Sequence, residues 1–326
     1  MESPELYIKT PLLHSQVLSD LVSTPVYLKL ENVQLSNSFK IRGFAHSILE
    51  RLKEGECEGF VTLSAGNGGI GLAYACQLLK RPCHVFVPNF VSPRILGKIK
   101  SLGAIIHACG GGKDYVEKAI DFAAQNPQWV FIHPHENPNM WDGYSKMIQE
   151  IKEELPPGTV PSCIVASVGG GGLLTGILNE INRNGWGSVP VVATETFGAH
   201  CFNKSLEAGE IILNEPMTSV AKTLGAACCT AKVLELAKVF NVISTVITDD
   251  KAVEACVKFA DDHTFLVEPA AGVSLATVYS QLLPEILSER GFNISDGPVV
   301  IIVCGGCDIN LEILWDHATK FKLIEH

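Results

Sequence analysis

The chain has 326 residues, of which 47% are hydrophobic and 18% are charged, and its mean hydropathy is +0.23. This length and composition predict a compact globular fold with room for two domains and large buried cores. The formal net charge of -10 argues against nucleic acid or an anionic membrane as the main partner, because both favour clustered Lys and Arg. No secretory signal is visible and no apolar run reaches the ~18 residues of a transmembrane helix, so we expect a cytoplasmic protein.

Short apolar runs alternate along the chain with segments of helical character, for example 70–79 and 92–102. Continuous apolar runs separated by helices are what parallel strands buried on both faces require. The sequence therefore predicts an α/β fold, and no internal repeat or Pro/Ser-rich linker marks a boundary in it. The runs that we expect to form strands are, in chain order, 25–30, 59–63, 84–88, 104–107, 130–133, 164–168, 189–193 and 299–303.

One lysine stands out near the first of these strands. Lys40 follows the apolar Phe39, ten residues after the run 25–30. An amine among apolar groups loses stabilisation of its charged form and becomes a usable nucleophile or base. A solvated lysine at a strand-to-helix turn is the ordinary alternative.

Four consecutive glycines at 169–172 follow a predicted buried strand and precede the helical segment 173–178. They free the backbone to wrap its N–H groups around an anion, and the helix N-terminus adds its dipole. A tight turn with close helix packing rarely needs four glycines in a row. The loop lacks the GK[ST] of a Walker loop and the GxGxxG dinucleotide pattern. We therefore expect it to bind the phosphate of a small cofactor.

The eleven cysteines are scattered through apolar segments, a pattern typical of reduced, buried thiols. Cys304 and Cys307 form a CxxC pattern that suggests redox chemistry or zinc. No second CxxC or CxxH pair follows at metal-finger spacing, so we do not expect a zinc site.

A nucleophilic amine together with a phosphate loop suggests pyridoxal phosphate, and six ordered motifs make this specific. They lie at 38–43 (SFKIRG), 64–67 (SAGN), 167–174 (SVGGGGLL), 195–200 (ETFGAH), 266–270 (LVEPA) and 303–306 (VCGG). In this order they resemble the animal L-serine/L-threonine dehydratases, which are fold-type II pyridoxal-phosphate enzymes. The resemblance begins at residue 9 and runs nearly end to end.

The resemblance implies a fold of two open, mostly parallel twisted sheets flanked by helices. A large domain would comprise residues 1–41 and 139–326, and a small domain residues 42–138. The segment around Lys40 would join them, with the cofactor in the cleft, and the protein would be a homodimer.

The same resemblance implies the reaction and the residues that hold the cofactor. The enzyme would eliminate water from L-serine, and from L-threonine, giving pyruvate or 2-oxobutanoate plus ammonia, with a place in gluconeogenesis. Lys40 would form the Schiff base and serve as the base for the Cα proton, and the cofactor phosphate would protonate the leaving hydroxyl. The cofactor-binding residues implied are Phe39 against the ring, Asn67 at the 3′ oxygen, and Gly169, Gly170, Gly171, Gly172 and Leu173 around the phosphate.

Further roles concern the ring nitrogen and the substrate. Cys304 would face the ring nitrogen, and because a thiol is a weak donor, it would temper the electron sink and favour elimination. Ser64, Ala65 and Gly66, at a helix start, would receive the substrate carboxylate through their N–H groups. His135 stands where relatives have an aromatic lining the substrate pocket, and we favour it as a harmless substitute over an imidazole that alters pH response.

A monovalent cation site is also implied, with potassium as the expected ion. Glu195 would bind it together with the carbonyl groups of Gly169, Ala199, Leu224 and Ala226. Cys201 stands where a hydroxyl ligand is frequent, and a neutral thiol is a poor ligand for a hard cation. A carboxylate that caps a local turn is the alternative interpretation of Glu195.

Other functions remain open at the level of sequence. A serine racemase needs a second acid/base opposite Lys40, where a serine hydroxyl in relatives matches Ala65, and alanine cannot transfer a proton. A β-replacement enzyme would need a pocket for a second substrate. A cofactor-binding protein that has lost turnover, with His135 as the suspect residue, is a third alternative.

Overall fold

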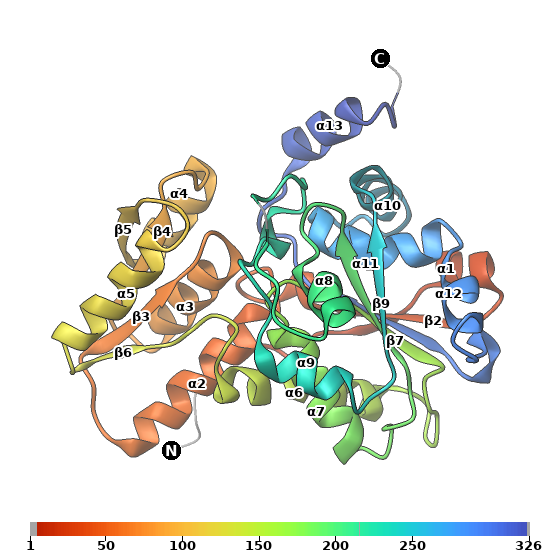
Figure 1. The fold of residues 1–326 in the computed structure, drawn as a ribbon, viewed down its shortest axis with the longest axis horizontal. Helices are drawn as coiled ribbons and strands as arrows, with labels where there is room; N and C mark the ends of the chain where they lie inside the picture. Colours follow the sequence, from red (N-terminus) through yellow and green to blue (C-terminus); the bar gives the residue numbers. More distant parts are fainter. Residues whose placement is uncertain (1–4, 215, 325–326) are drawn as a thin grey trace. The chain divides into compact units, whose positions relative to one another are not determined.

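The computed structural model describes residues 5–214 and 216–324. Packing divides them into two compact units. The first contains the described residues up to Ile8 and Val33–Tyr144, and the second contains Lys9–Asn32 and the described residues from Ser145 onward. Each unit is built on one sheet, of four strands in the first and six in the second. Two mostly parallel sheets flanked by helices confirm the predicted α/β class (Figure 1).

The units cut the chain at other residues than the predicted domain boundaries at 42 and 138. Phe39 packs with the first unit, because it is buried and contacts Tyr144 at 4.9 Å between ring centroids. The domain boundaries themselves stay a prediction.

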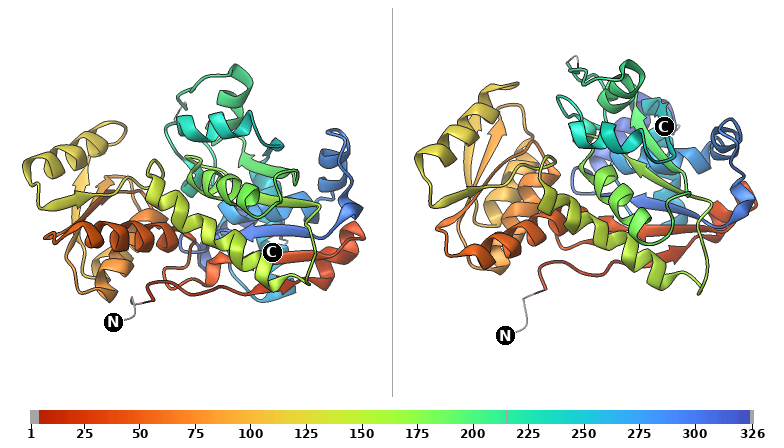
Figure 2. Two further views of the ribbon diagram at one scale, coloured as in Figure 1. Left: turned by 90° about the horizontal axis from the view of Figure 1, so that it is seen from below. Right: turned by 60° about the horizontal axis from the view of Figure 1, so that its bottom comes forward.

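The sheet of the first unit is parallel, with the strand order β5-β4-β3-β6. The crossover helices α3 and α4 cover one face and α5 covers the other, as right-handed crossovers require when the strand order reverses (Figure 2). Its elements are α2 (Lys40–Glu54), β3 (Gly59–Leu63), α3 (Asn67–Leu78), β4 (Cys83–Pro88), α4 (Pro93–Ser101), β5 (Ile105–Cys109), α5 (Asp114–Gln125), β6 (Trp129–Phe131) and the start of α6 (Pro138–Glu154).

The sheet of the second unit has the order β1-β2-β10-β7-β8-β9, and only β1 is antiparallel in it among the described strands. The buried helix α11 packs on β10, β7 and β8, while α7 and α9 pack together below the sheet in Figure 1. The strands are β1 (Leu12–His14), β2 (Val26–Leu30), β7 (Cys163–Ser167), β8 (Val191–Thr196), β9 (Val242–Ile247) and β10 (Val299–Val303). The helices are α1 (Gln16–Val22), α7 (Gly172–Arg183), α8 (Cys201–Ala208), α9 (Ala231–Ala237), α10 (Asp249–His263), α11 (Pro269–Tyr279), α12 (Leu283–Ser288) and α13 (Leu311–Lys320), with short 3₁₀ turns η1 (Glu31–Val33), η2 (Lys222–Leu224) and η3 (Ile294–Asp296).

Continuous apolar runs located the buried strands well. The runs 59–63 and 299–303 coincide with β3 and β10, in which every residue is buried. Sequence reasoning missed β1 and β9. Most residues of β9 are half-exposed because it is the edge strand of its sheet, and β1 has only three residues. Neither therefore shows a continuous apolar run.

No helix among residues 5–214 and 216–324 is long and apolar enough to span a membrane.

Candidate active site

Lys40 is the first residue of α2, and it lies in an aromatic setting within the first unit. Its Nζ donates a hydrogen bond to the carbonyl oxygen of Pro134 at 2.8 Å. Nζ also lies 5.2 Å from the ring centroid of Phe39 and 5.9 Å from that of Tyr144. Three residues before Lys40, Asn37 adopts a left-handed backbone at φ 59°, which Asn tolerates better than most residues. The amine is thus half-buried among apolar groups.

Two histidines flank Pro134 and therefore lie near the lysine. The His133 and His135 rings are 4.5 Å apart in an edge-on arrangement. Burial lowers the pKa of His133 to about 4, with a smaller contribution from the charge of Lys40. Burial, then His133 and Lys40, hold the pKa of His135 well below its usual value. Both rings are neutral at pH 7, and His133 Nδ1 accepts the Glu136 N–H at 2.9 Å.

The Ser64–Asn67 segment leads from β3 into α3 and presents helix N–H groups. Ser64 and Asn67 are buried, whereas Ala65 is exposed. The Ser64 hydroxyl accepts the N–H of Gly66 at 3.1 Å, and no side chain caps the helix at Gly66. A helix leaves the N–H groups of its first turn without intrahelical acceptors. This start is therefore suited to a carboxylate.

The glycine loop connects β7 with α7 in the second unit. Gly171 has φ +88°, and a Cβ there would lie 2.6 Å from Val233 Cγ1. A Cβ on Gly169 would lie 3.2 Å from the carbonyl oxygen of Leu224. No side chain caps α7, whose first residues Gly172, Leu173 and Leu174 are buried. Buried first-turn N–H groups fit a phosphate, and a side chain at 171 would clash with Val233 and displace the loop.

Cys304 follows the last residue of β10, next to β7 in the same sheet. Its thiol is buried, and Sγ accepts a hydrogen bond from the Ser167 hydroxyl at 3.3 Å. No signal in the sequence indicated the contact with Ser167, which lies 137 positions away. None of the eleven cysteines, which all lie in the described part of the chain, forms a disulfide, and all but Cys228 are buried, as predicted. Within the described part of the chain, no group of three or more His, Cys, Asp or Glu side chains is arranged to hold a metal ion.

Glu195, near the end of β8, is fully buried and caps a helix. Its two carboxylate oxygens accept the N–H groups of Phe202 at 2.9 Å and Asn203 at 2.7 Å, in the first turn of α8. Burial raises the pKa of Glu195 to about 8, although these two hydrogen bonds act in the opposite direction. These two hydrogen bonds are the ones expected from the alternative interpretation, in which Glu195 caps a local turn.

The other predicted cation ligands lie close by in the fold and have internal hydrogen bonds. The Cys201 thiol donates to the carbonyl oxygen of Gly169 at 3.5 Å. The carbonyl oxygen of Ala226 accepts the Asn214 side-chain amide at 3.0 Å, and that of Leu224 accepts the Ala226 N–H at 2.7 Å. Ala199, whose N–H donates to Thr196, is buried just before α8. Burial, followed by the neighbouring Glu195, raises the pKa of the Cys201 thiol, which keeps it neutral.

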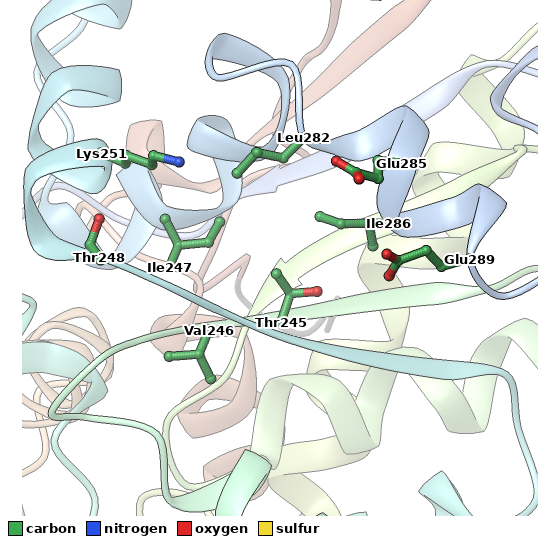
Figure 3. Close-up of a pocket in the computed structure, with 9 residues that line it drawn as sticks. All are labelled: Thr245, Val246, Ile247, Thr248, Lys251, Leu282, Glu285, Ile286 and Glu289. Carbon is green, nitrogen blue, oxygen red and sulfur yellow. The ribbon is translucent and has the colours of Figure 1, made fainter.

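A separate pocket of the second unit contains none of the predicted site residues (Figure 3). In this view Leu282, Ile247 and Ile286 lie between Lys251 and the carboxylates of Glu285 and Glu289. The residues that line it come from β9, α10, α12 and the segments beside them: Thr245, Val246, Ile247, Thr248, Lys251, Leu282, Glu285, Ile286 and Glu289.

Comparison with known proteins defines the class to which this fold and these residues belong. The family model described as pyridoxal-phosphate dependent enzyme matches residues 4–305. The chain is 41% identical to mouse L-serine dehydratase/L-threonine deaminase over 322 residues, covering 98% of this chain and 96% of that protein. The chain belongs to the family of pyridoxal-phosphate dependent enzymes.

Solved structures agree with this membership. The fungal L-serine ammonia-lyase from Rhizomucor miehei superposes with a TM-score of 0.86 at 29% identity, covering 97% of this chain and 99% of that one. Maize serine racemase superposes with a TM-score of 0.84 at 25% identity, covering 97% and 93%. The predicted resemblance and the fold-type II architecture are therefore confirmed.

Proposed function

We propose that this protein is a pyridoxal-phosphate dependent L-serine ammonia-lyase that also acts on L-threonine. The products would be ammonia with pyruvate or 2-oxobutanoate. The observation that carries the proposal is the placement of Lys40, a half-buried amine at a helix start in an aromatic setting. The high identity to an L-serine dehydratase over nearly the whole chain supports it.

The residues present fit the cofactor. Gly169–Gly172 and Leu173 offer an uncapped, buried helix start for the phosphate, and Lys40 offers an amine for the aldehyde. Phe39 would pack against the ring, and it also packs edge-on against Tyr144, so both roles of this ring are compatible. Asn67 would hydrogen-bond the 3′ oxygen and Cys304 would face the ring nitrogen. When bound, pyridoxal phosphate supplies an electron sink for the bonding pair released at Cα.

The protein's own groups orient the substrate and move its protons. Of the three predicted donors before α3, the Ala65 N–H would hold the substrate carboxylate together with the first turn of the helix. The Ser64 N–H donates to the carbonyl oxygen of Phe86 at 2.9 Å and the Gly66 N–H to the Ser64 hydroxyl at 3.1 Å, so Ser64 would assist through its hydroxyl. Lys40 would remove the Cα proton, since an amine in this setting is the only base that we assign there. His135 would line the substrate pocket as a neutral ring, because its pKa lies well below the usual value.

Elimination is favoured over racemisation by Ala65. Racemisation requires a second group that delivers a proton to the opposite face of Cα, and the methyl group of alanine cannot do so. The likeness to maize serine racemase makes this distinction worth measuring. D-serine formed from L-serine at a rate that rivals ammonia release would assign the racemase function instead.

Potassium binding, oligomeric state and location belong to the proposal as well. A potassium ion would lie between Glu195 and the carbonyl groups of Gly169, Ala199, Leu224 and Ala226, beside Cys201. The buried carboxylate would then gain a counter-charge. We further propose a cytoplasmic homodimer whose pyruvate feeds gluconeogenesis.

The test is a coupled pyruvate assay with L-serine on the protein loaded with pyridoxal phosphate. The parent should release ammonia and pyruvate in equal amounts and show a visible absorption band from cofactor attached to lysine. Lys40→Ala should lose both the band and turnover. Lys40→Arg, which keeps the positive charge but offers no primary amine, should lose them as well. Retained turnover in either variant would refute the role of Lys40.

A further inference from the structure

Glu268 is a buried carboxylate that connects two segments of the second unit. Its side chain is 1% exposed, and it stands directly before α11. Oε1 accepts the Thr223 hydroxyl at 2.7 Å, and Oε2 accepts the Asp308 backbone N–H at 3.1 Å. Its own N–H donates to the carbonyl oxygen of Gly305 at 3.3 Å. One residue thus links the η2 turn to the loop that follows β10.

The η2 turn packs against the glycine loop. Leu224 ends this turn, and its carbonyl oxygen would lie 3.2 Å from a Cβ on Gly169. Because Gly169 has no side chain, the two backbone segments are in direct contact. A displacement of Thr223 is therefore transmitted to the first residue of the loop that we assign to the phosphate.

The loop after β10 carries Cys304 and connects that strand to α13. Between Val303 and Leu311 the chain forms no helix or strand. Hydrogen bonds to a carboxylate are roughly twice as strong as neutral ones, so the bond from the Asp308 N–H to Glu268 adds a strong tether to the packing of this loop. The Cys304 thiol itself meets Ser167, the last residue of β7.

We propose that Glu268 is a positioning residue, which holds the Cys304 loop in register with the η2 turn and the glycine loop. The Cys304 thiol is a weak hydrogen-bond donor, so the strength of its hydrogen bond to the ring nitrogen of the cofactor would depend on its exact position. The significance of Cys304 and Gly169 in this proposal rests on the proposed function, whereas the tether itself does not.

Four variants separate the tether from general stability. Glu268→Ala removes both acceptors, and Thr223→Val removes only the hydroxyl. Glu268→Gln keeps both links, because its amide oxygen accepts the Asp308 N–H and its NH₂ donates to the Thr223 oxygen. Glu180→Gln is the matched control: Glu180 is 3% exposed, and its side-chain partners Gln149, Arg183 and Asn184 lie outside both segments.

Hydrogen exchange on the cofactor-free protein measures the tether directly. Glu268→Ala should accelerate exchange in residues 304–310 and 222–226, and Thr223→Val only in 222–226. Glu268→Gln and Glu180→Gln should match the parent in both segments. Unchanged exchange at 304–310 in Glu268→Ala, or equal acceleration throughout the unit, would overturn the proposal. If Glu268→Ala does not fold, unchanged exchange at 222–226 in Thr223→Val overturns it.

The loaded enzyme gives the second readout. Glu268→Ala should lower kcat for L-serine about tenfold with KM within about twofold, and shift the absorption maximum of the bound cofactor. Glu268→Gln should restore both. A parent that releases no ammonia from L-serine would refute the proposed function, while the exchange data still decide on the tether. An active parent with an unaltered Glu268→Ala variant would refute the positioning role alone.

Discussion

Glu195→Gln tests whether the buried carboxylate at the start of α8 titrates near neutral pH. Burial raises its pKa to about 8 in the folded protein, against 4.5 for the free group. Between these values the folded state holds a proton that the unfolded state has released. Stability from this group is therefore complete below about 4.5 and falls as the pH rises toward about 8.

The magnitude follows from the two pKa values. One pKa unit corresponds to about 1.4 kcal/mol, so between about pH 6 and about pH 8 the parent should lose about 2 kcal/mol through Glu195. The glutamine amide does not titrate, and its NH₂ faces one of the two N–H donors of α8, at Phe202 or Asn203. This mismatch should destabilise the variant by about 1–3 kcal/mol at low pH.

The assay is denaturant unfolding of parent and variant at both pH values in tetramethylammonium chloride. The difference between them should narrow by about 2 kcal/mol on going from about pH 6 to about pH 8. If a potassium ion binds beside Glu195, its charge lowers the pKa of the carboxyl. In potassium chloride the parent should then keep its stability between these pH values, and the difference from the variant should no longer narrow. A difference that stays constant in both salts would refute the titration and the cation site together.

Two further predictions concern the glycine loop and the histidine pair. Gly171→Ala should destabilise the protein by about 1–2 kcal/mol, because alanine is strained in a left-handed backbone. It should also weaken cofactor binding, because its Cβ would lie 2.6 Å from Val233. The control Gly185→Ala has a similar φ of +76° with open space around the Cβ, so it should lower the unfolding midpoint and leave the cofactor titration unchanged. Equal cofactor affinity in both variants would contradict the assignment of the loop. His135→Phe should leave the shape of the activity profile between about pH 6 and pH 8 unchanged, because the low pKa keeps His135 neutral throughout this range. The control His133→Phe should also keep the shape of the profile but lower the unfolding midpoint, because it removes the acceptor of the Glu136 N–H. An acid limb of the activity profile that disappears only in His135→Phe would show that His135 titrates during catalysis.

Much of the candidate site was predictable because its motifs are local. Lys40 beside Phe39, the Ser64–Asn67 turn and the four glycines each place their chemistry within a few residues of a strand end or a helix start. Strand and helix periodicity then locates them, and the order of the six motifs identifies the family. The glycine loop is an example: the contacts proposed for the phosphate come from backbone N–H groups, so a run of glycines is itself the signal.

What sequence reasoning missed depends on partners that are distant along the chain. Ser167 meets Cys304 across 137 positions, and Thr223 meets Glu268 across 45. Neither pair has a spacing that indicates contact. The edge strand β9 escaped notice for a related reason, since its residues are only partly buried.

The amino-acid sequence by itself determined the α/β class and the family, and it singled out Lys40 and the glycine loop as candidates, because periodicity and glycine content act locally. Only the tertiary structure decided that Glu195 caps α8, that His135 is neutral and that Glu268 ties the Cys304 loop to the η2 turn. The physical reason is that neighbouring strands in a parallel sheet bring the ends of sequence-distant segments to one edge, where burial and hydrogen bonds set each group's charge and position.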